Sequence, residues 1–221
     1  MDFILGIIKL YCERFGFFIE LLIQHILLSG TAIIFITVIG LILGIYITKN
    51  KKSAGIVLGI SNFLYTIPSI ALFGFLVAIS GIGNKSALIA LTVYGVLPII
   101  RNTYVGICEV DIQIIESAVA MGSTNSQLFF KVQFPLALPV IIAGFRTMVV
   151  MTIALSGIAS FIGAGGLGVA IWRGITTNFP EMTAAGSLLV AALAVVSDLS
   201  LGIFEKKIRK RVLGTEKIGG M

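Results

Sequence analysis

Residues 21–48 read LLIQHILLSGTAIIFITVIGLILGIYIT, a run that contains no Asp, Glu, Lys or Arg. A helix of about 20 residues crosses the hydrocarbon core of a bilayer, so this run is long enough to span a membrane. Its apolar residues are continuous rather than alternating with polar ones, which excludes a strand of a membrane β-barrel. The run therefore predicts a transmembrane α-helix, because a helix satisfies its backbone hydrogen bonds internally.

Four further stretches meet the same criterion, namely residues 55–80, 86–108, 137–160 and 183–204. The composition agrees with this pattern, since 57% of the 221 residues are hydrophobic and only 12% are charged. A water-soluble domain of this size could not cover so much apolar surface with polar groups. The sequence therefore predicts an all-α membrane protein with five transmembrane helices.

The segments that flank these spans have a different character. Residues 1–20 mix charged and apolar side chains, which predicts an N-terminal interfacial helix rather than a sixth span. Residues 206–221 form a basic tail, and the membrane domain accordingly occupies residues 21–205. One such domain uses nearly the whole chain and leaves no room for a separate nucleotide-binding or substrate-binding domain, so any such activity is expected to come from partner proteins.

Basic residues predict the orientation of the chain in the membrane, because Lys and Arg concentrate in cytosolic loops. We expect the N-terminus outside, the C-terminus in the cytosol, residues 109–135 inside and residues 161–182 outside. The residues on which this rests are Lys49, Lys51 and Lys52 after the first span, and Lys206, Lys207, Arg209, Lys210, Arg211 and Lys217 after the fifth.

The longest cytosolic loop, residues 109–136, reads EVDIQIIESAVAMGSTNSQLFFKVQFPL and predicts two short helices. Asp111 is expected to cap the first helix, which ends toward Gly122, a residue suited to a left-handed conformation. Thr124 and Gln127 have the spacing of a capping box for a second helix, which is expected to stop at Pro135.

The first of these helices is expected to dock against another protein, because an amphipathic helix this short is marginal on its own. It carries small residues beside a carboxylate, a pattern that allows close approach of a partner. The residues that we assign to this docking surface are Asp111, Ile115, Glu116, Ser117, Ala118, Val119 and Gly122, with Ile112 also exposed.

This loop resembles the EAA loop of binding-protein-dependent ABC importer permeases. The resemblance rests on Glu116-Ser117-Ala118, on Gly122 six residues after the glutamate, and on Pro135 and Leu138-Pro139. Ser117 departs from the alanine that is usual in the family. The resemblance implies that the short helix is a coupling helix, which fits a groove on a separate ATPase subunit and transmits its closure to the spans.

Four longer stretches resemble the permeases of osmoprotectant importers for glycine betaine, choline and carnitine. They are TIPSIALFGF (66–75), SGIGNKSALIALTVYGVLPIIRNTYVGI (80–107), FPLALPVIIAGFRT (134–147) and IGAGGLG (162–168). The resemblance implies a bacterial cytoplasmic membrane protein with a second permease subunit, ATPase subunits and an extracytoplasmic substrate-binding protein. ATP would be bound by the partner and no cofactor by this chain. Methionine or other amino-acid importer permeases are the alternative family.

Several residues are candidates for a gate or hinge. Prolines inside spans remove a backbone hydrogen bond and kink or open the helix, and glycines allow sharp turns and close helix packing. The segment 163–168 has the GxGxxG spacing, but it follows a membrane helix instead of a strand, which excludes a nucleotide-binding fingerprint. The gate or hinge candidates are Pro68, Pro98, Gly163, Gly165, Gly166 and Gly168.

The remaining polar residues predict neither catalysis nor metal binding. His25 has no second candidate ligand beside it and is interpreted as an interfacial residue near the outer end of its span. Arg101, Arg146 and Asp198 are explained by snorkelling or by mutual pairing. The basic residues gather at the ends of apolar runs, which argues against nucleic-acid binding. A secondary transporter remains a weaker alternative, because five spans do not divide into inverted repeats.

Overall fold

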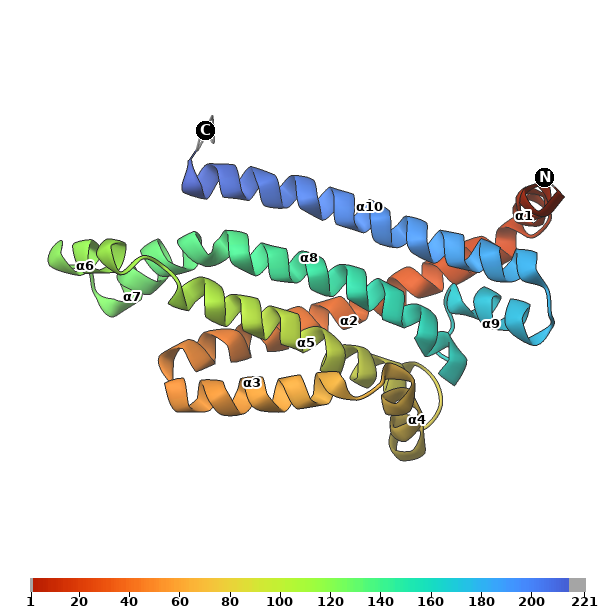
Figure 1. The fold of residues 1–221 in the computed structure, drawn as a ribbon, viewed down its shortest axis with the longest axis horizontal. Helices are drawn as coiled ribbons and strands as arrows, with labels where there is room; N and C mark the ends of the chain where they lie inside the picture. Colours follow the sequence, from red (N-terminus) through yellow and green to blue (C-terminus); the bar gives the residue numbers. More distant parts are fainter. Residues whose placement is uncertain (1, 215–221) are drawn as a thin grey trace.

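The computed structural model describes residues 2–214, and every element in that range is helical (Figure 1). The all-α prediction is therefore confirmed for this part of the chain. Residues 215–221, including Lys217 of the basic tail, lie outside the described residues. The elements are α1 (Asp2–Glu13), α2 (Phe15–Lys49), α3 (Lys51–Thr66), α4 (Ser69–Ser80), α5 (Asn84–Cys108), α6 (Ile112–Ala120), α7 (Asn125–Leu128), a π-helical turn (Phe129–Gln133), α8 (Phe134–Ala159), a 3₁₀ turn (Ser160–Ile162), α9 (Gly168–Thr176) and α10 (Pro180–Leu213).

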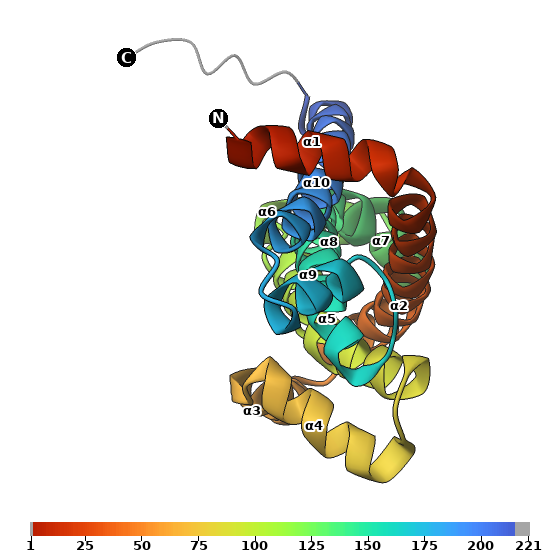
Figure 2. The same ribbon diagram turned by 90° about the vertical axis from the view of Figure 1, so that its right-hand side faces the viewer.

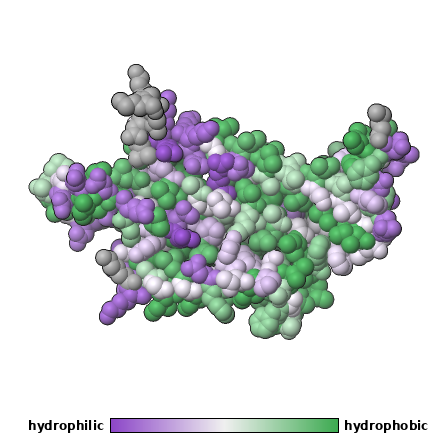
Figure 3. All heavy atoms as spheres, in the orientation of Figure 1, coloured by the Kyte–Doolittle hydropathy of each residue, from purple (hydrophilic) through white to green (hydrophobic). Residues whose placement is uncertain are grey.

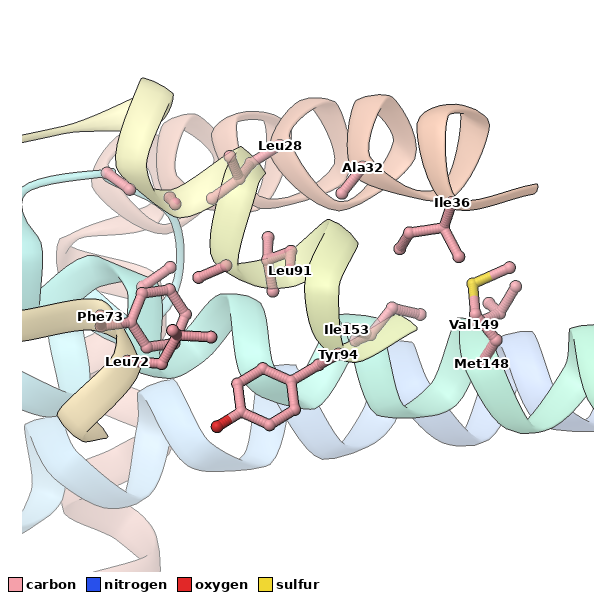
Figure 4. Close-up of a cluster of buried hydrophobic side chains, with 14 of the residues drawn as sticks. Leu28, Ala32, Ile36, Leu72, Phe73, Leu91, Tyr94, Met148, Val149 and Ile153 are labelled. Atoms are coloured by element: carbon pink, nitrogen blue, oxygen red, sulfur yellow. The ribbon is translucent and has the colours of Figure 1, made fainter. Parts of the chain in front are cut away.

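The centre of the bundle is formed by α2, α5 and α8, which lie side by side and enclose the main apolar core (Figure 4). Ile36 of α2, Leu91 of α5 and Met148 of α8 are fully buried there. Close approach of α2 and α5 depends on glycine, since a Cβ at Gly44 would lie 2.6 Å from Thr103 Cβ. Small residues at such contacts are what allow membrane helices to pack closely.

Four helical runs in residues 2–214 are long and apolar enough to cross a membrane, and a fifth span exists if α3 and α4 are counted together. The helix break expected at Pro68 inside the 55–80 run is confirmed, because α3 and α4 meet at an angle of 97°. The break lies at Ile67 and Pro68. Ile67 is extended, with φ −66° and ψ 128°, since a residue before proline is pushed away from helical geometry.

The helix does not break at the two other prolines, Pro98 and Pro135, where the sequence suggested an interruption or an end. Helix α5 continues through Pro98, so no interruption like that at Pro68 occurs there. The expected stop at Pro135 is also wrong, because the helical run extends without a gap from Asn125 to Ile162. The π-helical turn before α8 explains this continuity, since the wider turn bonds Phe134 N to Phe129 O and accommodates the missing N–H of the proline.

Helix α1 lies across the end of the bundle, at a large angle to the long helices (Figure 2). Ile7 and Leu10 on one face are buried against α2 and α10, while Phe3, Ile4 and other apolar residues on the opposite face are exposed. The Tyr11 hydroxyl donates a hydrogen bond of 2.8 Å to the carbonyl of Ala185, and burial raises its pKa. This arrangement is compatible with the interfacial segment predicted for residues 1–20, which stays a prediction.

The contact between α2 and α5 generates a test of the fold. Gly44→Ala should destabilise the protein by about 1–3 kcal/mol, because the new methyl group has no room beside Thr103. Gly30→Ala in the same helix is the matched control, since nothing lies within 4 Å of a Cβ at that position. Thermal unfolding in detergent measures both variants. Equal melting temperatures for the two would contradict this account of the packing.

Candidate functional site

The loop between α5 and α8 forms the two capped helices that its sequence predicts. Asp111 Oδ1 accepts a hydrogen bond of 2.8 Å from Gln113 N at the start of α6. Gly122 has φ +84° after the end of α6, the left-handed conformation that favours glycine. Thr124 and Gln127 then form a reciprocal capping box, with distances of 3.3 Å from Gln127 N to Thr124 Oγ1 and 2.9 Å from Thr124 N to Gln127 Oε1.

Helix α6 projects at one end of the molecule and exposes apolar side chains (Figure 1). Ile112, Val119 and Met121 are 62%, 54% and 81% exposed. Figure 3 shows hydrophilic and hydrophobic residues mixed over this end. Apolar side chains this exposed on a short helix mark a surface suited to a protein partner.

Two residues of the expected docking surface are on α6 but are partly or fully covered by the rest of the chain. Ala118 is only 4% exposed and Ile115 is half-buried, because this side of α6 turns toward α7 and the π-helical turn. Glu116 and Ser117 are exposed, and the Ser117 hydroxyl donates to the carbonyl of Gln113 at 2.7 Å. Ile114, which sequence reasoning missed, is exposed; the 3.6-residue period of a helix could have indicated its position.

A groove of about 980 Å³ separates α6 and α7 from the ends of α2 and α5. Ile115, Tyr104 and Phe129 contribute to its walls. Lys49 at the end of α2 stands over the Phe129 ring, with Nζ 5.8 Å from the ring centroid. The cation therefore links the first long helix to the π-helical turn that follows α7.

The glycine-rich loop lies at the opposite end of the bundle. Gly163, Gly165 and Gly166 have φ of +79°, +74° and +80°, which confirms the sharp turn expected of them. Gly168 confirms the expected close packing, since a Cβ there would lie 1.9 Å from the carbonyl oxygen of Gly157. Their action as a gate stays a prediction.

Two polar residues of α2 lie against this loop, and sequence reasoning missed their role. Gln24 Oε1 accepts a hydrogen bond of 3.1 Å from Gly166 N. The interfacial interpretation of His25 is wrong, because its side chain is fully buried and its Nε2 lies 3.0 Å from the carbonyl oxygen of Ile153. The loop covers His25, and a side chain at Gly166 would lie against the ring. Gln24 and His25 are adjacent polar residues inside an apolar run, and this pattern could have indicated that they make polar contacts within the protein.

A group of charged residues joins α8 to α10. Arg146 forms a bidentate ion pair with Asp198, with distances of 2.6 Å from Nε to Oδ1 and 2.7 Å from Nη2 to Oδ2. Mutual pairing of these two residues is therefore confirmed. Glu205, which was not anticipated, also binds the guanidinium, with Oε2 3.1 Å from Nη1. Arg101 is exposed on α5 and does not join the group.

Proteins of known function resemble the chain over most of its length. A carnitine transport permease protein of Listeria monocytogenes, OpuCD, is 38% identical over 209 residues, which are 94% of each chain. A choline transport system permease protein of Bacillus subtilis, OpuBB, is 40% identical over 84% of this chain and 85% of its own. An ergothioneine transport permease/ergothioneine binding protein of Helicobacter pylori, EgtU, is 43% identical over 80% of this chain, which spans only 32% of that relative.

Solved structures support the fold. An inward-facing MetNI methionine ABC transporter matches with a TM-score of 0.76 and 23% identity, covering 86% of this chain and 95% of the other. An amino acid ABC transporter with histidines matches with a TM-score of 0.76 and 18% identity, covering 89% and 96%. At these identities the likeness shows the fold alone. A family model matches residues 36–210, and the chain is thereby a member of the family described as binding-protein-dependent transport system inner membrane component.

Proposed function

We propose that this permease subunit carries a trimethylammonium osmoprotectant such as glycine betaine, choline or carnitine across the bacterial cytoplasmic membrane. It works with ABC ATPase subunits, a second permease subunit and an extracytoplasmic binding protein. The observation that carries the proposal is identity to the carnitine and choline permeases over most of both chains. ATP is hydrolysed by the partner in this proposal, and no catalytic residue is assigned to the chain.

The names of the relatives point to one chemical class of solute. Carnitine, choline and ergothioneine all contain a trimethylammonium group, and each appears in the name of a relative that is 38% to 43% identical. Methionine has no such group. The methionine importer resembles this chain at 23% identity, a likeness that supports the fold and not the solute. The trimethylammonium class is therefore the better proposal.

The exposed side chains of α6 support its assignment as the coupling helix. Among residues 2–214, the Glu116 side chain makes no hydrogen bond or ion pair, so its carboxylate is available to a partner. Exposed apolar residues surround it. The capped ends of α6 hold this surface in one shape, which favours a docking role over a flexible loop.

The positions of the basic residues support the proposed topology, in which the N-terminus is outside and the C-terminus is inside. The connection from α2 to α3, the α6–α7 loop and the end of α10 lie at the same end of the bundle (Figure 1). The α2–α3 connection contains Lys49, Lys51 and Lys52, and the end of α10 contains five Lys and Arg residues, whereas the only basic residue near the α6–α7 loop in the sequence is Lys131 in the π-helical turn. The α3–α4 pair then leads to the opposite end, where Gly83 N bonds Ile162 O at 2.9 Å beside the glycine-rich loop. A bent pair counted as one span accounts for the fifth crossing.

Reporter fusions test this topology. A reporter that is active only in the cytosol should be active after Lys52 or Arg211, and inactive at Asn84 or Asn178. An inactive reporter in the α6–α7 loop would contradict both the topology and the coupling role, because the ATPase is cytosolic in this proposal.

Substitutions in α6 test coupling. Glu116→Ala should remove a charge-assisted contact worth roughly 1.5–3 kcal/mol, and Gly122→Val should add about 1–2 kcal/mol of strain at the end of the helix. Both variants should insert in the membrane and bind the loaded receptor, yet lose transport and stimulated ATP hydrolysis. Reconstituted vesicles provide all four measurements.

Glu109→Ala is the matched control for these variants, since Glu109 is also an exposed carboxylate but lies at the end of α5, outside α6. It should retain transport. Normal transport by Glu116→Ala or Gly122→Val, or a changed choice of solute with normal turnover, would contradict the coupling assignment.

Uptake assays test the solute. Cells without other osmoprotectant importers should regain growth at high osmolarity when they receive this permease with its partners and glycine betaine, choline or carnitine. Methionine uptake in a methionine auxotroph is the competing measurement. Rescue of the auxotroph without osmoprotection would favour the amino-acid alternative.

A further inference from the structure

One face of α8 is left open between α3 and α10. A pocket of about 610 Å³ lies on this face, and small or flexible apolar residues form much of its floor. The residues that line it are Ala143, Arg146, Thr147, Val150, Met151, Ala154, Asp198 and Glu205. The α8 members recur every three or four residues, so they form one stripe along the helix.

The charges of this pocket do not cancel. Arg146 supplies one positive charge, and Asp198 and Glu205 supply two negative ones, so the group has one carboxylate in excess. Arg146 uses both oxygens of Asp198 but only Oε2 of Glu205. Among residues 2–214, Glu205 forms no ion pair with the basic residues that follow it on α10. Its Oε1 remains available to a cation.

The position of the group in the membrane requires a polar or protein cover. Arg146 and Asp198 fall inside the spans predicted over 137–160 and 183–204, and Glu205 directly follows the second of these. Ionisable side chains in spans face a water-filled space or protein rather than lipid, because lipid exposure is costly. If two permease subunits enclose a pathway, as in the proposed function, this open face of α8 is suited to line it.

An aromatic residue lies beside the same stripe. The Tyr65 hydroxyl, near the end of α3, approaches Met151 Sδ at 3.4 Å, and its ring stands edge-on to Tyr94 with centroids 6.0 Å apart. Tyr65 is also partly exposed. Aromatic faces and carboxylates are the two groups that attract a quaternary ammonium ion, which cannot accept or donate a conventional hydrogen bond.

Two other grooves have the wrong charge for such an ion, and the groove of about 460 Å³ beside the glycine-rich loop has no charged lining residue. The groove beneath α6 contains Lys49, and the groove between α8 and the end of α10 contains Lys131 and Arg211. Neither groove is lined by a carboxylate. Electrostatic attraction of a cation therefore favours the pocket at Glu205.

We propose that this face of α8 is part of the solute path, with Glu205 as the counter-charge and Tyr65 as an aromatic contact for a trimethylammonium cation. The proposal rests on the proposed function, since it needs a second subunit to close the path. Asp198 holds Arg146 in place, and Glu205 and Tyr65 determine specificity.

The test uses the complete reconstituted complex with its binding protein, and choline as the probe because choline has no carboxylate of its own. Glu205→Gln keeps an acceptor for Arg146 but removes the excess charge. Choline turnover should fall by about tenfold at saturating loaded receptor, while receptor-stimulated ATP hydrolysis stays within about twofold of the wild type. Glu205→Asp should restore most of the turnover.

A second pair of variants tests the aromatic contact. Tyr65→Leu should lower choline turnover by about two- to fivefold, whereas Tyr65→Phe keeps the ring and should retain it. Tyr65→Phe also removes the hydroxyl contact with Met151, so a loss in both variants would assign Tyr65 to packing and contradict its role in the path.

The outcomes separate this inference from the proposed function. A wild-type complex that moves no trimethylammonium solute contradicts the proposed function itself. If the wild type moves choline and Glu205→Gln moves it equally well, the inference fails and the function stands. Equal loss of choline turnover and ATP hydrolysis, with a lowered melting temperature, would assign Glu205 to bundle stability and would also overturn the inference.

Discussion

Close contact between α2 and α5 is the interaction on which the rest of the structure depends. A bilayer offers little hydrophobic drive for helix association, because lipid tails are as apolar as leucine side chains. Close van der Waals packing between the helices therefore has to supply the free energy of association. Gly44 against Thr103, and Gly95 against Ile36, let the two backbones approach where a Cβ would collide. Helix α8 then completes the three-helix centre, with Gly144 against Asn102 of α5.

This centre connects the two ends of the molecule through one helical run. The capping box of Thr124 begins a run that continues through the π-helical turn and α8 to Ile162. The carbonyl of Ile162 accepts from Gly83 N, beside the glycine-rich loop. A displacement of α7 would therefore act on the same helix that ends at that loop. If α6 and α7 dock on an ATPase, as in the proposed function, this connection would transmit the movement to the distant turn.

Several of the charged and polar groups in the bundle have defined partners. Gln24 holds the glycine-rich loop to α2, His25 joins α2 to α8, and Asp198 binds Nε and Nη2 of Arg146. Removing a partner from a buried polar group costs more than the bond contributes, so such contacts also restrict how the helices can rearrange. The open face of α8 is different, since its two carboxylates, Asp198 and Glu205, share the single positive charge of Arg146.

Local chemistry allowed much of this protein to be predicted from its sequence. Apolar runs of span length, the Asp111 cap, the left-handed Gly122 and the Thr124 capping box each depend on residues close together in the chain, and all have the expected form. The kink at Pro68 was likewise indicated locally, whereas its angle of 97°, the continuous helix through Pro135, the burial of His25 and the addition of Glu205 to the Arg146 pair were decided by tertiary structure. The burial of His25 and the pairing of Glu205 depend on groups that are distant in sequence. At a proline the chain can either continue as a helix or bend, and the packing of the surrounding helices selects between these two conformations.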